Sequence, residues 1–129
     1  MSVSLRSIPD TQAAVGWAGS HTVVIDRPDG KAGGAGLGFN GGQMIALAIG
    51  GCFCNDLRYM AETMAVTIDD IAVDVTITLE GQPALVTAAA VVAKVRGSGD
   101  MAELIRRAAA DSTIGNSIQR GFPVTINQA

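Results

Sequence analysis

The segment from Gln43 to about Met64 constrains the fold most, because its apolar residues recur with a helical period. Over the first three turns these residues occupy nearly every side of the predicted helix. They are Met44, Ile45, Leu47, Ala48, Ile49 and Phe53. A helix that is apolar all round is buried, so we expect this one at the centre of the fold. Its second half, from Asn55 to Glu62, is amphipathic and should approach solvent.

The same segment is too short to cross a membrane. Its uninterrupted apolar run, from Met44 to Cys54, has eleven residues, whereas a bilayer span needs about 18 or more. The amino terminus, Met1 to Pro9, lacks a basic region followed by an apolar region and a cleavage site. We therefore expect no membrane contact, no export signal and a cytoplasmic location, where both cysteines would be thiols.

Length and composition indicate one small domain spanning residues 1–129. The net charge of −3 gives no electrostatic reason to bind nucleic acid. Charged residues make up 16% of the chain and aromatic residues 4%, so its apolar surplus consists of small side chains. Because a small domain buries a modest fraction of its surface alone, this surplus favours a second subunit that completes the core.

The first forty residues predict short strands and a loop. Stretches typical of β-strands occur at Val3 to Leu5, Ala13 to Ala18 and Thr22 to Ile25, separated by Pro, Gly and Asp residues. Residues 29–42 hold seven glycines and almost no periodicity. We predict two or three antiparallel strands, followed by a flexible connector that is too irregular to bind a nucleotide.

The second half predicts a hairpin and further helices. The expected elements are a connection at 66–70, strands at 73–80 and 85–95, a helix at 101–111, a helical turn at 114–119 and a strand at 122–127. Gly81, Gln82 and Pro83 make the hairpin turn, and Ser98 to Asp100 cap the helix. This order predicts an α+β fold in which a helix faces an antiparallel sheet.

Two adjacent glycines, Gly50 and Gly51, lie inside the long helix. Each glycine weakens a helix by about 1 kcal/mol relative to alanine. Such a pair in a buried helix permits another backbone to approach closely. We expect a partner helix to pack there.

The two cysteines, Cys52 and Cys54, are two residues apart on this helix and so point to nearly opposite sides. We expect no disulfide between them, and Cys54 is interpreted as a core residue. His21 is the only histidine and no metal-ligand spacing occurs, so neither a metal nor another cofactor is expected. His21 is typical of a hydrogen-bonded structural residue. Other polar and sulfur-containing residues have structural interpretations: the methionines Met44, Met60 and Met64 as core residues, and Asp69 and Asp70 as a solvated turn.

The string from Asn40 to Phe53, NGGQMIALAIGGCF, follows the glycine-rich loop and opens the long helix. It resembles the OsmC/Ohr family of osmotically inducible and organic hydroperoxide resistance proteins. The likeness extends to His21–Asp26, Leu57–Ala61 and Ile71–Thr78. It implies an OsmC-like fold with antiparallel sheets wrapped around a long central helix, in an intertwined homodimer with active sites at the subunit interface.

The resemblance also assigns site residues. Cys52 matches the cysteine that attacks a peroxide and becomes a sulfenic acid. Ser112 occupies the place of the family's second cysteine, and a hydroxyl is not expected to be redox active. Gly42 replaces a glutamate that helps to hold an arginine beside the thiolate. Only Arg6 and Arg27 precede the helix as candidates for that arginine.

Two functions follow. In the first, Cys52 is the one active cysteine of a peroxidase-type oxidoreductase that reduces or senses organic hydroperoxides in the oxidative stress response and is recycled by an external thiol. In the alternative, the fold is catalytically degenerate and the dimer holds a small hydrophobic molecule in an interface pocket beside Cys52. The position of Cys52 near the middle of the helix gives it little help from the helix dipole, which favours the alternative.

Overall fold

The computed structural model describes residues 1–128, and these form an α+β chain as predicted. The chain divides into two compact units, Met1–Ile45 and Ala46–Ala129. Five strands and three helices follow one another within residues 1–128 in the order β1, β2, β3, α1, β4, β5, α2, α3. The strands form two antiparallel sheets, one in each unit.

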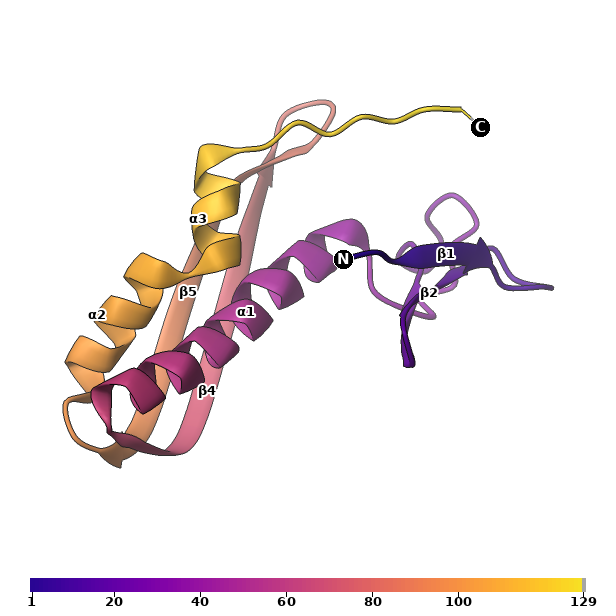
Figure 1. Cartoon of the computed structure of the whole chain (residues 1–129). Coiled ribbons are helices and arrows are strands. Elements are labelled where there is room, and N and C mark those ends of the chain that lie inside the picture. Colours follow the sequence, from indigo (N-terminus) through magenta and orange to yellow (C-terminus); the bar gives the residue numbers. More distant parts are fainter. Residues whose placement is uncertain (129) are drawn as a thin grey trace. The chain divides into compact units, whose positions relative to one another are not determined.

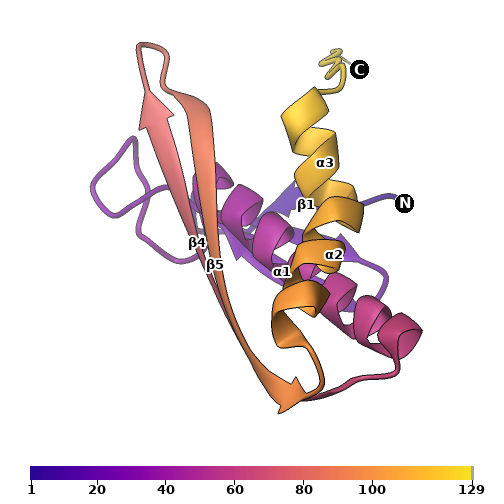
Figure 2. The same cartoon turned by 90° about the vertical axis from the view of Figure 1, so that its left-hand side faces the viewer.

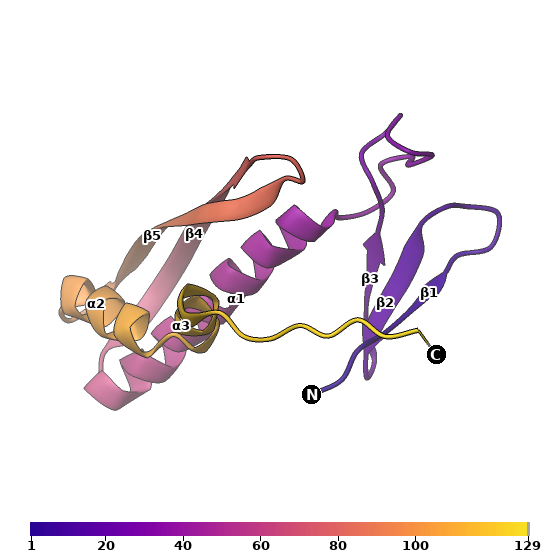
Figure 3. The same cartoon turned by 90° about the horizontal axis from the view of Figure 1, so that it is seen from above.

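The amino-terminal unit is built on three short strands, β1 (Ser4–Ser7), β2 (Ala14–Ala18) and β3 (His21–Ile25). They pair in the order β1-β2-β3, each antiparallel to its neighbour (Figure 3). Ala18 pairs with His21, so a two-residue turn joins β2 to β3. Gly19 has a φ of 60° in that turn, a conformation that glycine adopts readily. The predicted strands are confirmed.

The glycine-rich loop after β3, which the sequence analysis interprets as a flexible connector, is hydrogen-bonded within its own unit. The carboxylate of Asp26 is buried and accepts hydrogen bonds from the backbone N–H groups of Ala35 at 3.0 Å and Leu37 at 3.1 Å. Gly38 lies so close to β3 that a Cβ there would collide with the Val24 carbonyl. The glycines therefore allow close packing of the loop against its own unit, which composition alone does not distinguish from mobility.

Helix α1 (Gly41–Met64) begins two residues before the predicted start at Gln43. Asn40 and Gln43 form a capping box: the Asn40 N–H donates to Gln43 Oε1 at 2.9 Å, and the Gln43 N–H donates to Asn40 Oδ1 at 3.0 Å. At the other end, the Val66 N–H donates to the Ala61 carbonyl, and Ala65 takes the left-handed conformation at φ 54°. This pattern is a Schellman motif, which ends the helix.

The carboxy-terminal unit contains a long hairpin of β4 (Thr67–Glu80) and β5 (Leu85–Ser98), followed by α2 (Met101–Asp111) and α3 (Thr113–Arg120). Figures 1 and 2 show that α1 and α2 lie on the same side of the hairpin. The Asp100 side chain accepts a hydrogen bond from the Glu103 N–H at 3.0 Å and caps α2 as predicted. The predicted helical turn at 114–119 is also confirmed and corresponds to α3.

The hairpin is longer than the sequence pattern indicated. We expected a connection at residues 66–70 with Asp69 and Asp70 in a turn, but β4 already begins at Thr67. Asp69 lies at an irregularity where the register steps from Ile68 to Asp70, and this extra residue interrupts the alternation. Asp70 pairs with Arg96, whose Nη2 lies 2.9 Å from Asp70 Oδ2.

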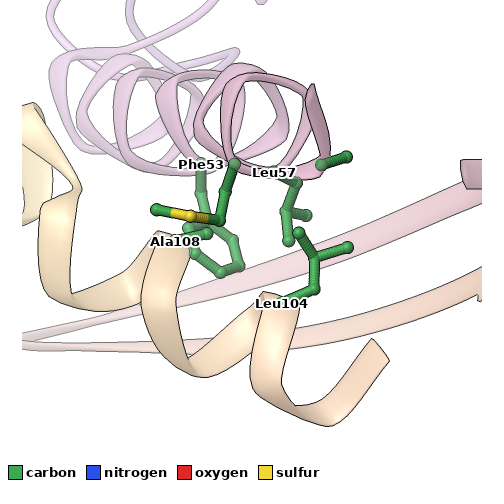
Figure 4. Packing of buried hydrophobic residues seen from close by; sticks show 6 residues of the cluster. Phe53, Leu57, Leu104 and Ala108 are labelled. Carbon is green, nitrogen blue, oxygen red and sulfur yellow. The ribbon is translucent and has the colours of Figure 1, made fainter. Parts of the chain in front are cut away.

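The core of this unit lies between α1, α2 and the hairpin (Figure 4). Leu57 from α1 and Leu104 from α2 are both 0% exposed. The cluster of buried apolar residues comprises Phe53, Leu57, Met60, Ala61, Leu104 and Ala108. Met64 packs against this cluster, so Met60 and Met64 are core residues as predicted, while Met44 is half-buried in the amino-terminal unit.

Within one chain, α1 is not covered on all sides. Leu47 is 50% exposed, and a Cβ added at Gly51 would meet nothing within 4 Å. A Cβ added at Gly50, in contrast, would lie 2.9 Å from Cγ2 of Val75 on β4. In this chain Gly50 therefore brings α1 close to a strand of its own hairpin, and the packing of a partner helix at the glycine pair stays a prediction.

The last predicted strand, Phe122–Asn127, is wrong for the single chain. Residues 121–128 are outside any helix or strand, and their side chains are exposed. Phe122, Val124 and Ile126 alternate as an edge strand would require, with Phe122 64% exposed and Ile126 91% exposed. The alternation is real, but among residues 1–128 no strand pairs with it.

Candidate functional site

Cys52 lies at the start of the fourth turn of α1, at the margin of the helix face that packs into the core. Cys52 follows the buried Ile49 by three residues and directly precedes the buried Phe53, and Cys52 itself is half-buried. Cys54 is turned away by about 200° at 3.6 residues per turn and is also half-buried. Both cysteines are free, which confirms that they do not form a disulfide.

The Cys52 thiol has a carboxylate partner that the sequence analysis missed. Its Sγ lies 3.6 Å from Asp56 Oδ2 and 3.9 Å from Oδ1, so the thiol donates a weak hydrogen bond to Asp56. Residues four apart on a helix are neighbours on its surface. This spacing is the signal by which Asp56 could have been found.

The predicted arginine candidates are engaged inside the amino-terminal unit. Arg27 Nη2 donates to the Gln12 carbonyl at 2.8 Å and lies 3.6 Å from Asp26 Oδ1. The Arg6 guanidinium lies over the Trp17 ring, 6.0 Å from its centroid. Each arginine thus has a partner that holds it within its own unit.

Gly42 lies in the first turn of α1, which contains no acidic residue. The position that the resemblance assigns to a glutamate therefore supplies no carboxylate. The nearest acidic partner of Cys52 comes from the turn after it, through Asp56. The charged group that contacts this thiol from its own helix is thus a carboxylate.

Ser112 occupies the junction between α2 and α3 and is only 6% exposed. Its carbonyl accepts hydrogen bonds from the N–H of Asn116 at 3.0 Å and from Asn116 Nδ2 at 2.7 Å. Its hydroxyl makes no capping hydrogen bond to α3, although serine is a favoured capping residue. The Ser112 carbonyl thus stabilises the junction through its hydrogen bonds to Asn116, while the Ser112 hydroxyl takes no part in it.

The carboxy-terminal unit contains a pocket of about 230 Å³. Its walls come from α1, β5, α2 and α3. The lining residues are Ile49, Phe53, Val91, Ala93, Ile105, Ala109, Ser112, Gly115 and Gln119. Ser112 therefore lines this pocket, whereas Cys52 does not.

The remaining sequence candidates show no constellation for metal chemistry. His21 is exposed at the start of β3 and has no side-chain hydrogen bond among residues 1–128, so the expected structural hydrogen bond is not observed. In the same residues, no group of three or more His, Cys, Asp or Glu side chains could hold a metal ion. None of the helices there is long and apolar enough to cross a membrane.

Fold and site together define a small α+β thiol protein, in which two half-buried free cysteines lie on a long helix packed against a hairpin. A family model described as OsmC-like protein matches residues 33–127. The chain belongs to the OsmC-like protein family, which confirms the resemblance seen in the sequence. No curated protein matches the chain.

Solved structures show the same fold at low sequence identity. An OsmC-like protein of unknown function from Vibrio cholerae has a TM-score of 0.77 at 12% identity, over 90% of this chain and 91% of that one. An OsmC-like protein from Mycoplasma pneumoniae has a TM-score of 0.77 at 15% identity, over 92% and 86%. An organic hydroperoxide resistance protein OsmC from Legionella pneumophila has a TM-score of 0.70 at 18% identity, over 92% and 88%.

Proposed function

We propose that this OsmC-like protein reduces organic hydroperoxides through Cys52 and is recycled by an external thiol. The half-buried Cys52 thiol, hydrogen-bonded to Asp56, carries the proposal. The family and its hydroperoxide resistance members support it. With Ser112 in place of a second thiol, the sulfenic acid needs a reductant from outside the chain.

The reaction balances in two steps. The Cys52 sulfur attacks the outer oxygen of the hydroperoxide, the O–O bond breaks, and the products are a Cys52 sulfenic acid and an alcohol. Two molecules of an external thiol then reduce the sulfenic acid, giving the Cys52 thiol, a disulfide of the external thiol, and water. Each turnover moves two electrons from the external thiols to the hydroperoxide.

Asp56 has a defined place in the first step. Its carboxylate accepts a hydrogen bond from the thiol at 3.6 Å, so it is positioned to take the thiol proton as the sulfur attacks. The same proton then passes to the leaving alkoxide, which becomes the alcohol.

Asp56→Asn tests this role, because it removes the proton acceptor and keeps the size of the side chain. Reduction of cumene hydroperoxide requires the proton acceptor, so turnover with dithiothreitol should fall. Alkylation of Cys52 by iodoacetamide is the control for access to the sulfur and should persist in the variant. Lower turnover with retained alkylation supports the proton transfer, and unchanged turnover would contradict it.

The assignment of Cys52 as the reacting thiol is tested with Cys54 as the matched control. Mass spectrometry after treatment with cumene hydroperoxide and a sulfenic-acid trap should find the adduct on Cys52. Cys52→Ser should abolish turnover, while Cys54→Ser on the opposite flank should retain it. An untouched Cys52, or turnover that survives Cys52→Ser, would refute this function.

The protein is proposed to act as a homodimer. One chain leaves Leu47 of α1 and the alternating residues Phe122, Val124 and Ile126 exposed, and apolar surface of this kind is typical of an interface. Gly51 faces open space on α1, where the sequence predicts a partner helix. Sedimentation velocity should show a dimer that Gly51→Leu weakens, and a monomer at all concentrations would contradict the proposal.

A second function, binding of a small apolar molecule, is favoured by the pocket in the carboxy-terminal unit. Six of its lining residues are apolar with side chains larger than hydrogen: Ile49, Phe53, Val91, Ala93, Ile105 and Ala109. Cys52 does not line the pocket, so binding there should persist in Cys52→Ala. Loss of binding in that variant would mean that the thiol takes part.

A further inference from the structure

We infer that the pocket between α1, β5, α2 and α3 selects a small apolar molecule that carries one hydroxyl group, such as an alkylphenol or a medium-chain alcohol. This inference rests on the second proposed function and not on the chemistry of Cys52. It names the class of ligand and the group that recognises it, the hydroxyl of Ser112.

The volume of the pocket sets the size of the ligand. An engineered apolar cavity of about 150 Å³ is known to bind benzene. The present pocket, at about 230 Å³, has room for a benzene ring with a short alkyl chain. It is too small for a nucleotide, and its predominantly apolar walls offer no ion pair to a charged metabolite.

The walls determine where the apolar body lies. Ile49 and Phe53 come from α1, Val91 and Ala93 from β5, and Ile105 and Ala109 from α2. Both Ile49 and Phe53 are buried in the chain. Transfer of a hydrocarbon body from water to these surfaces is favourable and non-directional, so it gives affinity without choosing among apolar molecules.

The selectivity of the pocket among apolar ligands comes from Ser112. The residue is more than nine-tenths buried, it lines the pocket, and its hydroxyl makes no capping hydrogen bond. None of the side-chain hydrogen bonds among residues 1–128 uses this hydroxyl either. The Ser112 oxygen is therefore open to the pocket, where a bound molecule can reach it. A ligand hydroxyl is a suitable partner because it both donates and accepts.

Gly115 keeps the Ser112 hydroxyl accessible from the α3 side. A Cβ at this position would lie 3.3 Å from Ser112 Oγ, tighter than ordinary van der Waals contact. Gly115 also lines the pocket. Its hydrogen atom in place of a side chain thus leaves space in front of the one buried hydroxyl.

The test is an NMR titration of the whole chain with 4-propylphenol and with propylbenzene, which lacks the hydroxyl. We expect the phenol to bind more tightly, with shifts of amides in α2 and α3. Ser112→Ala should weaken phenol binding about tenfold and remove the preference. Ala109→Leu should fill the pocket and abolish binding of both probes, while Ala102→Leu, at an exposed position of the same helix, should leave binding unchanged.

The outcomes separate this inference from the functions on which it is built. Equal affinity for the two probes, or a preference that survives Ser112→Ala, overturns the role of Ser112 but leaves apolar binding intact. Absence of binding, together with a change of oligomeric state in Ala109→Leu, would show that a second copy fills the pocket and would overturn the inference. In each case the turnover of Cys52→Ser reports separately on the thiol function.

Discussion

Replacement of Gly50 by alanine places two known effects in opposition. Alanine favours a helix over glycine by about 1 kcal/mol, which would stabilise α1. The added Cβ would lie 2.9 Å from Val75 Cγ2 and 3.7 Å from Val73 Cγ1. Val75 is β-branched, so its methyl group cannot swing away without leaving its rotamer. Overpacking of this kind costs about 1–3 kcal/mol, so Gly50→Ala should be neutral or destabilise by up to about 2 kcal/mol.

The Val75→Ala background removes the obstructing methyl group and isolates the helical effect. There, Gly50→Ala should stabilise the protein by about 1 kcal/mol. The two substitutions are therefore expected to couple by about 1–3 kcal/mol, well above the additivity of independent sites. Urea unfolding of the wild type, both single variants and the double variant, followed by circular dichroism, measures this coupling.

The control is the slope of the free energy of unfolding with urea concentration, which should be the same for all four proteins. If Gly50→Ala stabilises the wild type and the Val75→Ala variant equally, the close approach of α1 to β4 is not the reason for the glycine. The helix would then have room for a side chain at position 50, and the steric role of Val75 would be refuted.

Three further changes test the loop, the core and a helix end. Backbone hydrogen bonds from Leu37 and Ala35 lower the pKa of Asp26 below its ordinary value of 3.8. The ionised carboxylate therefore stabilises the loop above pH 3.8, and this stabilisation is lost as the pH falls through the lowered pKa. Hydrogen exchange at the Ala35 amide should show protection at neutral pH that disappears below the lowered pKa. The same protection should be absent in Asp26→Asn. Leu104→Ala should lower the free energy of unfolding by about 2–5 kcal/mol, measured in urea, whereas Leu79→Ala, at a residue 53% exposed, should change it by less than about 1 kcal/mol. Ala65→Gly should raise the thermal midpoint in calorimetry, because glycine adopts the φ of 54° without the penalty of about 1–2 kcal/mol that a Cβ incurs; a lower midpoint would contradict the Schellman assignment.

The sequence predicted the elements whose signals are local. The alternation of Val73 to Leu79, the turn at Gly81 and the cap at Asp100 each depend on neighbouring residues, and each is present in the structure. The predicted boundaries of elements were wrong where the alternation of apolar and polar residues was interrupted. The irregularity at Asp69 concealed the start of β4, because one extra residue breaks the period of two.

The site was predictable only in part. Periodicity placed Cys52 and Cys54 on opposite flanks of α1, and both are free thiols. The pocket around Ser112 was not predictable, because it depends on how the distant helix α1 packs against β5, α2 and α3. The Gly50 contact with Val75 was missed for the same reason: a glycine in a helix shows that something approaches closely, but not what.

The extended segment at residues 121–128 would make protein concentration a variable in the folding of this protein if a second copy pairs with it. Its apolar side chains alternate and its backbone pairs with no strand of residues 1–128, so a single chain leaves the stabilisation of one strand unused. If a second copy supplies that pairing, each added chain shifts the balance toward the folded state by mass action. The thermal midpoint should then rise as the sample is concentrated, and dilution alone, without any denaturant, should loosen the structure.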